Sequence, residues 1–322
     1  MTKNASQGSI NQQIFPLIEE RILSELPGPP LSERKSIAGL PDMSFGNMPV
    51  DGGNLLMSAD GVGALGLGKE DEATLVRRIY GSAEFIRGLV RYCLWIPDEL
   101  LPRALKIQSI AARIESTKTM RMASKDAGTR DLAARAHQFR EMYVGMSRTL
   151  ILAGVSSESR EYLPVGLLSS HAVVSNLAFA LYDAPLWNLA LIGSRLHLVW
   201  IATVCGKLET RYRYSNTLGW NTFPAPSLTE KNKADLTRCA EDILLAREHH
   251  FPGTIADLYD PETMPLDLRQ AHERNDEVLE RIYIGRRFKN DTERLEKLFE
   301  MYTKMTRSAG LAGKKAKKVA RA

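Results

Sequence analysis

The sequence is poor in features that would place the protein in a membrane or outside the cell. Its 322 residues include only three cysteines, Cys93, Cys205 and Cys239, which are too widely spaced for a disulfide framework or a metal knuckle. The longest apolar run, at 185–205, is interrupted by an arginine and a histidine, whereas a membrane span needs roughly 18 apolar residues. The polar N-terminus has no signal-peptide core. We therefore expect a cytoplasmic protein without a membrane partner.

Motifs for catalysis are also missing. The only E-x-K is Glu33 to Lys35, which precedes both Pro-Asp pairs and so has the wrong order for a PD-(D/E)xK nuclease. There is no G-x-S-x-G and no H-E-x-x-H. The pair His249-His250 stands at an expected helix end, where a contact with the helix dipole is favoured over a metal site. The sequence predicts no catalytic and no metal-binding residue.

Two short motifs resemble cofactor or substrate loops and depart from them at decisive positions. "GVGALG" at 61–66 has G-x-G-x-x-G spacing, but the acids at 70–72 that follow it would repel a phosphate. We interpret it as a mobile loop. "NMPV" at 47–50 differs from the N-P-P-[FY] tetrad of adenine methyltransferases, because Met48 and Val50 cannot hold an extruded base. Neither motif supplies a cofactor site.

Positive charge is concentrated at the C-terminal end. From Thr303 onward there are seven basic residues and no acidic one. The net charge of the chain is +5, so the remainder carries −2 and is not broadly basic. Contacts with a nucleic acid must then be local. The segment 307–322 is expected to be a disordered basic tail, acting either as a solubilising end or as a nonspecific phosphate contact.

The order of expected elements defines a mixed α/β domain followed by a C-terminal α-helical bundle. After Pro226 three amphipathic helices are joined by short links, the first with capping-box spacing between Ser227 and Glu230 and the third starting near Asn290. Upstream, we expect helices at 10–25, roughly 70–90, 105–118 and 129–142, short strands between 160 and 182, and a long helix from Pro185 closed by Gly206.

One stretch carries charges of both signs in alternation. Glu209, Arg211 and Arg213 alternate with a threonine and two tyrosines, and residues two apart on a strand share one face. Arginine can bind O6 and N7 of guanine while glutamate accepts from N4 of cytosine, so this face suits the reading of G·C pairs. The alternative is a solvated edge strand, whose charges prevent aggregation.

The same stretch lies within a longer resemblance. "CGKLETRYRYSNTLGWNTFPAP" and "ADLYDPETMPLDLRQAHERNDEVLERIYIGRRFKNDTERLEKLFEMYTKMT" are similar to the C-terminal half of MmeI-like type IIL restriction–modification enzymes. Upstream, "MSFGNMPVDGGNLLMS", "RRIYGSAEFIRGLVRYCLWI" and "SREYLPVGLLSSHAVVSN" also resemble that family. In this family a target-recognition domain reads double-stranded DNA for an N6-adenine methyltransferase. The resemblance implies base contacts by Glu209, Arg211 and Arg213, with Asn176 on an earlier strand as a weaker candidate.

The resemblance also implies a division of the chain. Residues 1–40 are expected to be a helical remnant of a methyltransferase domain, 41–227 the target-recognition domain, 228–306 the helical bundle and 307–322 the tail. The N-P-P-F tetrad and the glycine loop for S-adenosylmethionine, the family's cofactor, are absent from the sequence, so this chain is expected to hold no cofactor. It is then a recognition module, a subunit acting with a separate methyltransferase or nuclease chain, or an inert remnant.

Overall fold

The computed structural model describes residues 33–319, with side chains up to residue 307. The helix expected at 10–25 lies outside the described residues. Residues 33–40 form bends and turns, so this described part of the expected helical remnant is not helical. The reason is that its backbone bonds elsewhere: Glu33 N donates to Thr217 O at 3.0 Å and Ile37 N to Asn221 O at 2.8 Å. Gly39 then adopts a left-handed φ of 69°.

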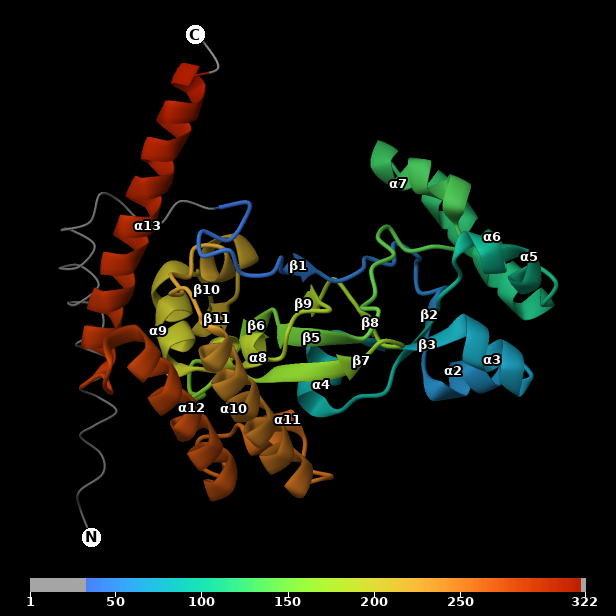
Figure 1. Cartoon of the computed structure of the whole chain (residues 1–322). Coiled ribbons are helices and arrows are strands. Elements are labelled where there is room, and N and C mark those ends of the chain that lie inside the picture. Colours follow the sequence, from blue (N-terminus) through green and yellow to red (C-terminus); the bar gives the residue numbers. More distant parts are fainter. Residues whose placement is uncertain (1–32, 320–322) are drawn as a thin grey trace.

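A four-stranded antiparallel sheet forms the middle of the molecule (Figure 1). Its order is β1 (Ser44–Phe45), β9 (Ala178–Tyr182), β5 (Arg148–Ala153) and β7 (Val165–Ser169). Residues 149–153 are all buried, because both faces of β5 are covered. Leu150 and Leu152 face the main core, which includes helix α8 (Trp187–Ile192), whereas Ile151 packs on the other face with Phe85 of α4 (Ser82–Arg87). A strand buried on both faces explains the continuous apolar run.

A second sheet with its own core lies beside the first. Its order is β2 (Leu56–Met57), β4 (Tyr92–Leu94), β3 (Val76–Tyr80) and β8 (Val173–Val174), with β8 parallel to β3. The surrounding elements are α2 (Ala59–Gly63), α3 (Lys69–Leu75), η1 (Asp98–Leu100), α5 (Leu101–Ala104), α6 (Gln108–Met122), α7 (Ala127–Asp131) and η2 (Leu132–Arg135).

A buried arginine joins the loops around this second core. The side chain of Arg121 on α6 is fully buried and donates to five backbone carbonyls, those of Pro49, Val50, Leu132, Arg135 and Gln138. Carbonyl acceptors satisfy every arm of the guanidinium, so the positive charge is held without an acidic partner. Burial lowers the pKa of Arg121.

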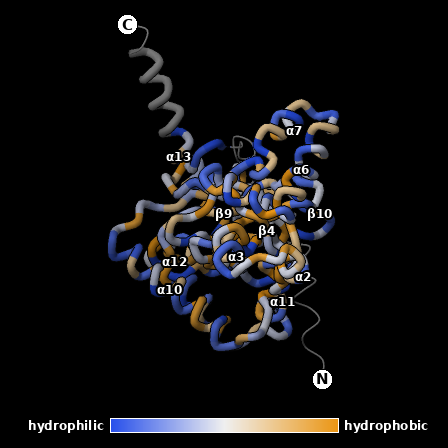
Figure 2. The backbone as a smooth tube through the Cα atoms, turned by 90° about the vertical axis from the view of Figure 1, so that its right-hand side faces the viewer, coloured by the Kyte–Doolittle hydropathy of each residue, from blue (hydrophilic) through white to orange (hydrophobic). Residues whose placement is uncertain are grey.

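The C-terminal helices share the core of the α/β part. They are α10 (Glu230–His249), α11 (Ile255–Leu258), α12 (Leu266–Ile284) and α13 (Asp291–Val319). Trp200 of α9 (Arg195–Val204) contacts Phe299 of α13 with ring centroids 5.1 Å apart. Arg195 also pairs with Asp291 at 2.5 Å. One apolar cluster therefore extends from β5 to α13, and hydrophobic segments run through the middle of the molecule near β4 and β9 (Figure 2).

The structure confirms the mixed α/β fold with a helical C-terminal part and corrects several element boundaries. The expected helix at 70–90 contains strand β3 between two short helices. The long helix from Pro185 is two helices, because Ser194 breaks it and caps α9 by accepting from His197 N. Cys205 is the C-cap of α9 in place of Gly206. The region 129–142 is helical only as far as Arg135.

The C-terminal boundaries differ less. The capping box of α10 is formed by Thr229 and Asn232 and not by Ser227 and Glu230. Asn290 caps α13 as expected, accepting from Glu293 N at 3.0 Å. Helix α13 continues through Val319, so no helix end separates the expected bundle from the expected tail. Within residues 33–319, no helix has the length and apolar character of a membrane span.

Candidate nucleic-acid interface

The charged stretch is a hairpin and not a single strand. Strands β10 (Lys207–Leu208) and β11 (Arg211–Arg213) pair antiparallel, and β11 continues the sheet to β6 (Val155–Ser156). Glu209 and Thr210 form the two-residue turn, in which Glu209 has a φ of 59°. The expectation that Glu209 lies on one strand face with the two arginines is therefore wrong. The alternation of side chains between two faces applies within a strand and does not extend to a residue in the turn.

The turn nevertheless brings the acid to the arginine. A carboxylate oxygen of Glu209 accepts from Arg211 Nη2 at 2.5 Å. Both side chains are largely open to solvent, with exposures of 73% for Glu209 and 49% for Arg211. Arg213 is also exposed and lies two residues further along β11, on the same face as Arg211. The result is a solvent-facing row that contains both a carboxylate and two guanidinium groups.

The opposite face of β11 anchors the row to the core. Tyr214 directly follows the strand and is buried; its hydroxyl lies 3.0 Å from His197 Nε2 and its ring meets Phe179 edge-on at 5.2 Å. Its backbone N donates to Gly154 O at 3.0 Å. Burial lowers the pKa of His197 to about 3, so this ring is neutral and can accept from or donate to the phenol. The exposed charges therefore stand on a fixed base.

One further charged residue belongs to this surface, and the sequence pattern missed it. Glu158 follows β6 and is exposed. A hydrogen bond with the Thr210 side chain lowers the pKa of Glu158, as do the charges of Arg211 and Lys207. The contact joins residues more than fifty positions apart. No spacing rule could have found it, because the pairing of β6 with β11 creates it.

Asn176 occupies a turn, which corrects its expected place on a strand. It lies between β8 and β9 and is half-buried. Its backbone N donates to Asn47 O at 3.0 Å. The buried side chain of Asn47 donates to Tyr143 O at 2.9 Å and Val174 O at 3.0 Å. The "NMPV" segment thus has a structural role here: it fixes the turn that presents Asn176.

A short hydrogen-bond chain connects this turn to the hairpin. Leu177 O accepts from the Ser82 hydroxyl at 2.5 Å, and that hydroxyl accepts from Gly154 N at 3.1 Å. Gly154 O in turn accepts from Tyr214 N at 3.0 Å. The two segments that carry the candidate base contacts are therefore tied to one another through α4 and the β5–β6 junction.

The other motifs do not join this surface. Gly61 lies inside the short helix α2, where no phosphate loop is formed. His249 and His250, at the end of α10, both contact Asp267, with His249 Nδ1 at 3.2 Å and His250 Nε2 at 2.7 Å from its carboxylate oxygens. Each of these three side chains has an atom that can bind a metal ion, and the three atoms lie within 4.8 Å of one another. The dipole contact expected from sequence is thus supplemented by a carboxylate.

An α/β domain with an exposed hairpin of mixed charge, followed by a helical domain, is the organisation expected from the sequence for a DNA target-recognition module. The comparison with family models agrees. Residues 31–227 match the MmeI target recognition domain and residues 228–309 match the MmeI C-terminal domain. The chain belongs to the MmeI family.

Two relatives illustrate the similarity. DNA methyltransferase A of Bacillus subtilis (strain 168) is 39% identical over 276 residues, which cover 85% of this chain and 31% of the relative. The solved structure of the type IIL restriction–modification enzyme MmeI in complex with DNA is similar with a TM-score of 0.82 and 31% identity, covering 87% of this chain and 38% of that one. The chain spans about a third of the length of these relatives.

Proposed function

We propose that this chain recognises a specific sequence in double-stranded DNA, as the target-recognition part of an adenine-specific methyltransferase of a restriction–modification system. Membership of the MmeI family and the similarity to a protein solved with DNA support the proposal. The proposed role is binding, and it rests on the hairpin and on the turn at Asn176.

The observation that carries the proposal is the Glu209–Arg211 pair on the anchored hairpin. An exposed ion pair contributes little to stability, about 0–1 kcal/mol, so the presence of this pair at the end of an anchored hairpin has no strong structural explanation. In a major groove Arg211 would donate to O6 and N7 of guanine. Glu209 would accept from N4 of the paired cytosine or brace the guanidinium. Arg213 and Asn176 would read neighbouring positions.

The test is the effect of Arg211→Ala on base preference. A preferred site is first selected from a random duplex library, and each base pair is then varied singly. We expect Arg211→Ala to weaken binding to the preferred site by about 1–3 kcal/mol and to relax preference at one position, with nonspecific affinity nearly unchanged. Reversing the pair, Glu209→Lys with Arg211→Asp, should move the preference to another base pair.

Arg274→Ala is the matched control, because Arg274 is an exposed arginine on α12 outside the hairpin. It should leave both affinity and preference unchanged. An equal loss of affinity for every sequence in Arg211→Ala would make this residue a phosphate contact and reject base readout.

A further inference from the structure

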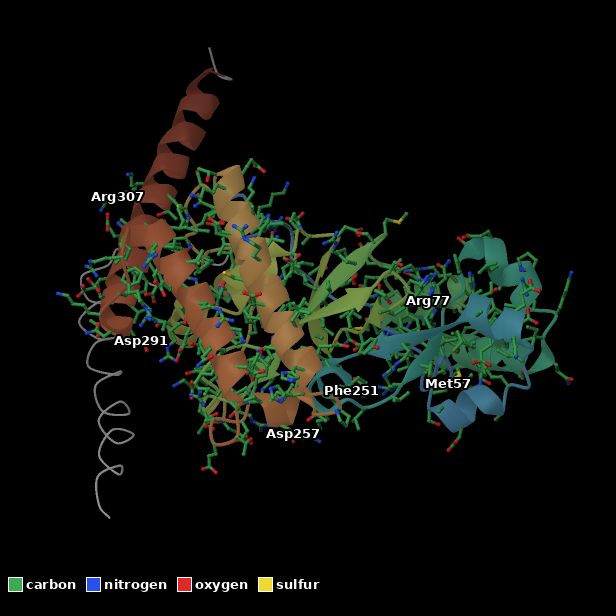
Figure 3. The ribbon with its side chains drawn as sticks, turned by 60° about the horizontal axis from the view of Figure 1, so that its bottom comes forward. Met57, Arg77, Phe251, Asp257, Asp291 and Arg307 are labelled. Atoms are coloured by element: carbon green, nitrogen blue, oxygen red, sulfur yellow. The ribbon has the colours of Figure 1, made fainter. Side chains whose placement is uncertain are left out.

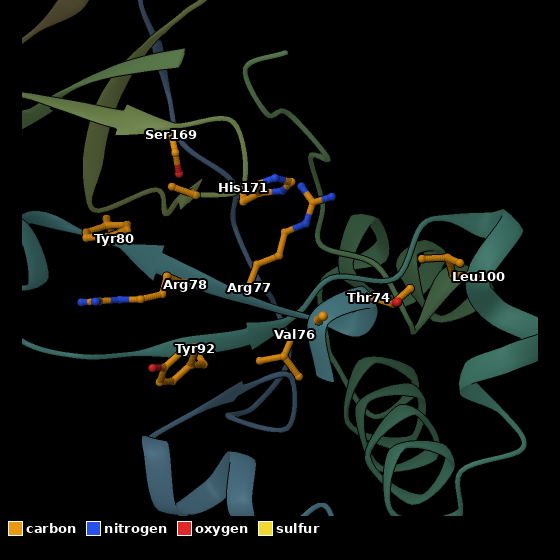
Figure 4. A pocket seen from close by; sticks show the side chains of 11 residues that line it. Thr74, Val76, Arg77, Arg78, Tyr80, Tyr92, Leu100, Ser169 and His171 are labelled. Carbon is orange, nitrogen blue, oxygen red and sulfur yellow. The ribbon is translucent and has the colours of Figure 1, made fainter. Parts of the chain in front are cut away.

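A cavity lies beside strand β3, away from the hairpin. Its volume is about 530 Å³, within the range of pockets that hold small ligands. Its lining includes Arg77 (Figure 3), Arg78, Tyr80, Ser169 and His171 (Figure 4). None of the described residues that line it is acidic.

The cavity exists because one edge of β3 is only partly paired. On one side β4 pairs with Val76, Arg77 and Arg78. On the other side β8 pairs only with Ile79 and Tyr80. The loop from Ser169 toward β8 passes beside the unpaired start of β3, and the cavity lies between the two. An open edge of this kind is normally protected by charged side chains.

The two arginines here are held in place by aromatic rings and not by acids. The guanidinium of Arg77 lies 5.6 Å from the ring centroid of Trp95, and that of Arg78 lies 5.1 Å from Tyr80. Within the described part of the chain, neither has an acidic partner within 4.0 Å. The Nε atom of Arg78 is buried and has no hydrogen-bond partner there.

Arg77 brings a positive charge without an acidic partner to the cavity, and Arg78 on the opposite face of β3 adds positive charge nearby, so the site favours an anion. Burial lowers the pKa of Arg77, yet arginine remains protonated in proteins. Planar guanidinium groups match the oxygens of a phosphate in geometry and charge. Figure 4 shows Arg77 extending toward the exposed His171, while Ser169 adds a hydroxyl at the rim.

We propose that this pocket, which we name the β3 phosphate site (Arg77, Ser169 and His171, with Arg78 on the opposite face of β3), binds a phosphate group. The favoured source is the backbone of the DNA whose recognition is proposed above, and that part of the inference rests on the proposed function. The site adds an affinity contact that does not depend on sequence, as phosphate contacts do.

The separation of the site from the hairpin is within the length of a short duplex. Arg148 pairs with Ser169 at one end of β5, and β5 leads at its other end to β6, the partner of the hairpin. Five residue steps of about 3.4 Å give β5 a length of roughly 17 Å, so the two sites are on the order of 20 Å apart. Each DNA strand presents a phosphate every ~3.4 Å along its axis, so one duplex has phosphates at this spacing from the bases read by the hairpin.

The experiment compares Arg77→Gln and Arg78→Gln with the wild-type chain and with Arg274→Gln. Glutamine keeps length and polarity and removes the charge. One arm measures affinity for a duplex lacking the preferred site over a range of NaCl concentrations. The other arm measures the midpoint of thermal unfolding with millimolar sodium phosphate against NaCl of equal ionic strength, which needs no DNA.

Loss of one phosphate contact should reduce the slope of log affinity against log salt by ~0.9. We expect this reduction in Arg77→Gln, a smaller one in Arg78→Gln, whose side chain lies on the opposite face of β3, and none in Arg274→Gln. We also expect phosphate to raise the wild-type unfolding midpoint in a saturable way, and Arg77→Gln to lose that rise. Unchanged salt slopes together with loss of the phosphate-dependent rise would support the site. They would show that its ligand is free phosphate and not the DNA backbone.

Two results separate the inference from the proposed function. If the wild-type chain shows no saturable rise with phosphate and the variants keep the wild-type salt slope, the β3 phosphate site is rejected. If no DNA binding is found at all, the proposed function fails. The thermal unfolding measurements alone then decide whether the pocket binds phosphate. A variant that does not fold leaves the wild-type thermal arm decisive, because absence of the rise there rejects the site.

Discussion

Glu209 combines a strained backbone with a charge that the fold does not need. Its φ of 59° is a conformation usually taken by glycine or asparagine. Such conformations raise the free energy of the folded state by roughly 1–3 kcal/mol and occur often at functional sites. The exposed ion pair with Arg211 stabilises the folded state by at most about 1 kcal/mol. Retention of a carboxylate here is therefore better explained by binding than by stability.

Glu209→Gly and Glu209→Ala separate these two effects. Both remove the carboxylate, so both should lose about 1–3 kcal/mol of discrimination at one base pair. Glycine accepts the left-handed backbone, whereas alanine retains the strain. The glycine variant should therefore be more stable than the alanine variant by about 1 kcal/mol and close to wild type.

Urea unfolding measures the stabilities, and competition between duplexes measures the discrimination. Wild-type selectivity in the glycine variant would show that the carboxylate takes no part in base readout. A glycine variant no more stable than the alanine variant would show that the turn is not strained.

At the scale of elements, the sequence supplies candidate residues for the site but not their geometry. Alternation of charged and aromatic residues looks the same in one long strand and in the second strand of a hairpin. The turn at Glu209–Thr210 contains no glycine or asparagine, the usual signals, so the sequence gives no reason to place a hairpin there. Glu158 enters only through pairing of β6 with β11.

The helix boundaries show the same limit for a different reason. The fold class follows from periodicity and from the resemblance, and it is confirmed. The run at 185–205 is mostly apolar because both of its helices are buried, so periodicity alone cannot show the break. Ser194 is the signal that was available, since serine is a favoured N-cap. At 70–90, tertiary pairing of β3 overrides a local helical pattern.

A substitution at Gly46 tests whether the close backbone contact beside the turn at Asn176 stabilises that turn. A Cβ atom at this position would lie 2.4 Å from both Val174 O and Ser175 O, which are backbone atoms that cannot move aside. Gly46→Ala should therefore destabilise the fold by about 1–3 kcal/mol and loosen the bridge between Asn47 and Ser175. Hydrogen exchange of the Asn176 amide should report the loosening, because this amide donates to Asn47 O.

Gly63→Ala is the matched control. No atom lies within 4 Å of the Cβ that would be added there, and Gly63 is in a helix. Alanine should be neutral or slightly stabilising at such a site. Equal stability of the two alanine variants in urea would show that the close approach of Gly46 to the turn is unimportant.

For the whole molecule, the contact between the α/β part and the C-terminal helices contains buried polar groups. Arg247 of α10 donates to Tyr259 and to Val165 O, and the Tyr259 hydroxyl lies 2.7 Å from His272 Nε2. On the same helix as His272, Asp276 accepts from Arg195 N at 2.8 Å. These bonds join helices α10 and α12 to the sheet and to α9. The two matched family segments thus fold as one body with a shared core.

Three of the buried groups make stability depend on pH in opposite senses. Burial raises the pKa of Asp276 to about 7, so the folded state holds a proton that the unfolded state loses above about pH 4, and stability falls as pH rises from about 4 to 7. Burial lowers the pKa values of His197 and His272 to about 3. Unfolding then takes up protons below about pH 6.5, so stability falls as pH decreases from 6.5 toward 3.

Asp276→Asn isolates the acid. Asparagine keeps an oxygen for the Arg195 amide and carries no charge, so it mimics the protonated aspartic acid at every pH. Each proton contributes a slope of about 1.4 kcal/mol per pH unit. Between about pH 4 and 6.5 the histidines contribute two protons and Asp276 opposes them with one. The stability of the variant should therefore rise with pH more steeply than that of the wild type, by up to about 1.4 kcal/mol per unit. The difference should level off above pH 7, where the variant is the more stable protein because it buries no charge.

Urea unfolding of both proteins from pH 4 to 8 measures the difference, in which groups common to both cancel. Parallel curves would show that Asp276 is ionised throughout this range. The contact between the two parts would then depend on a charged Asp276, stabilised by Arg195 and Arg294, and not on a protonated carboxyl group.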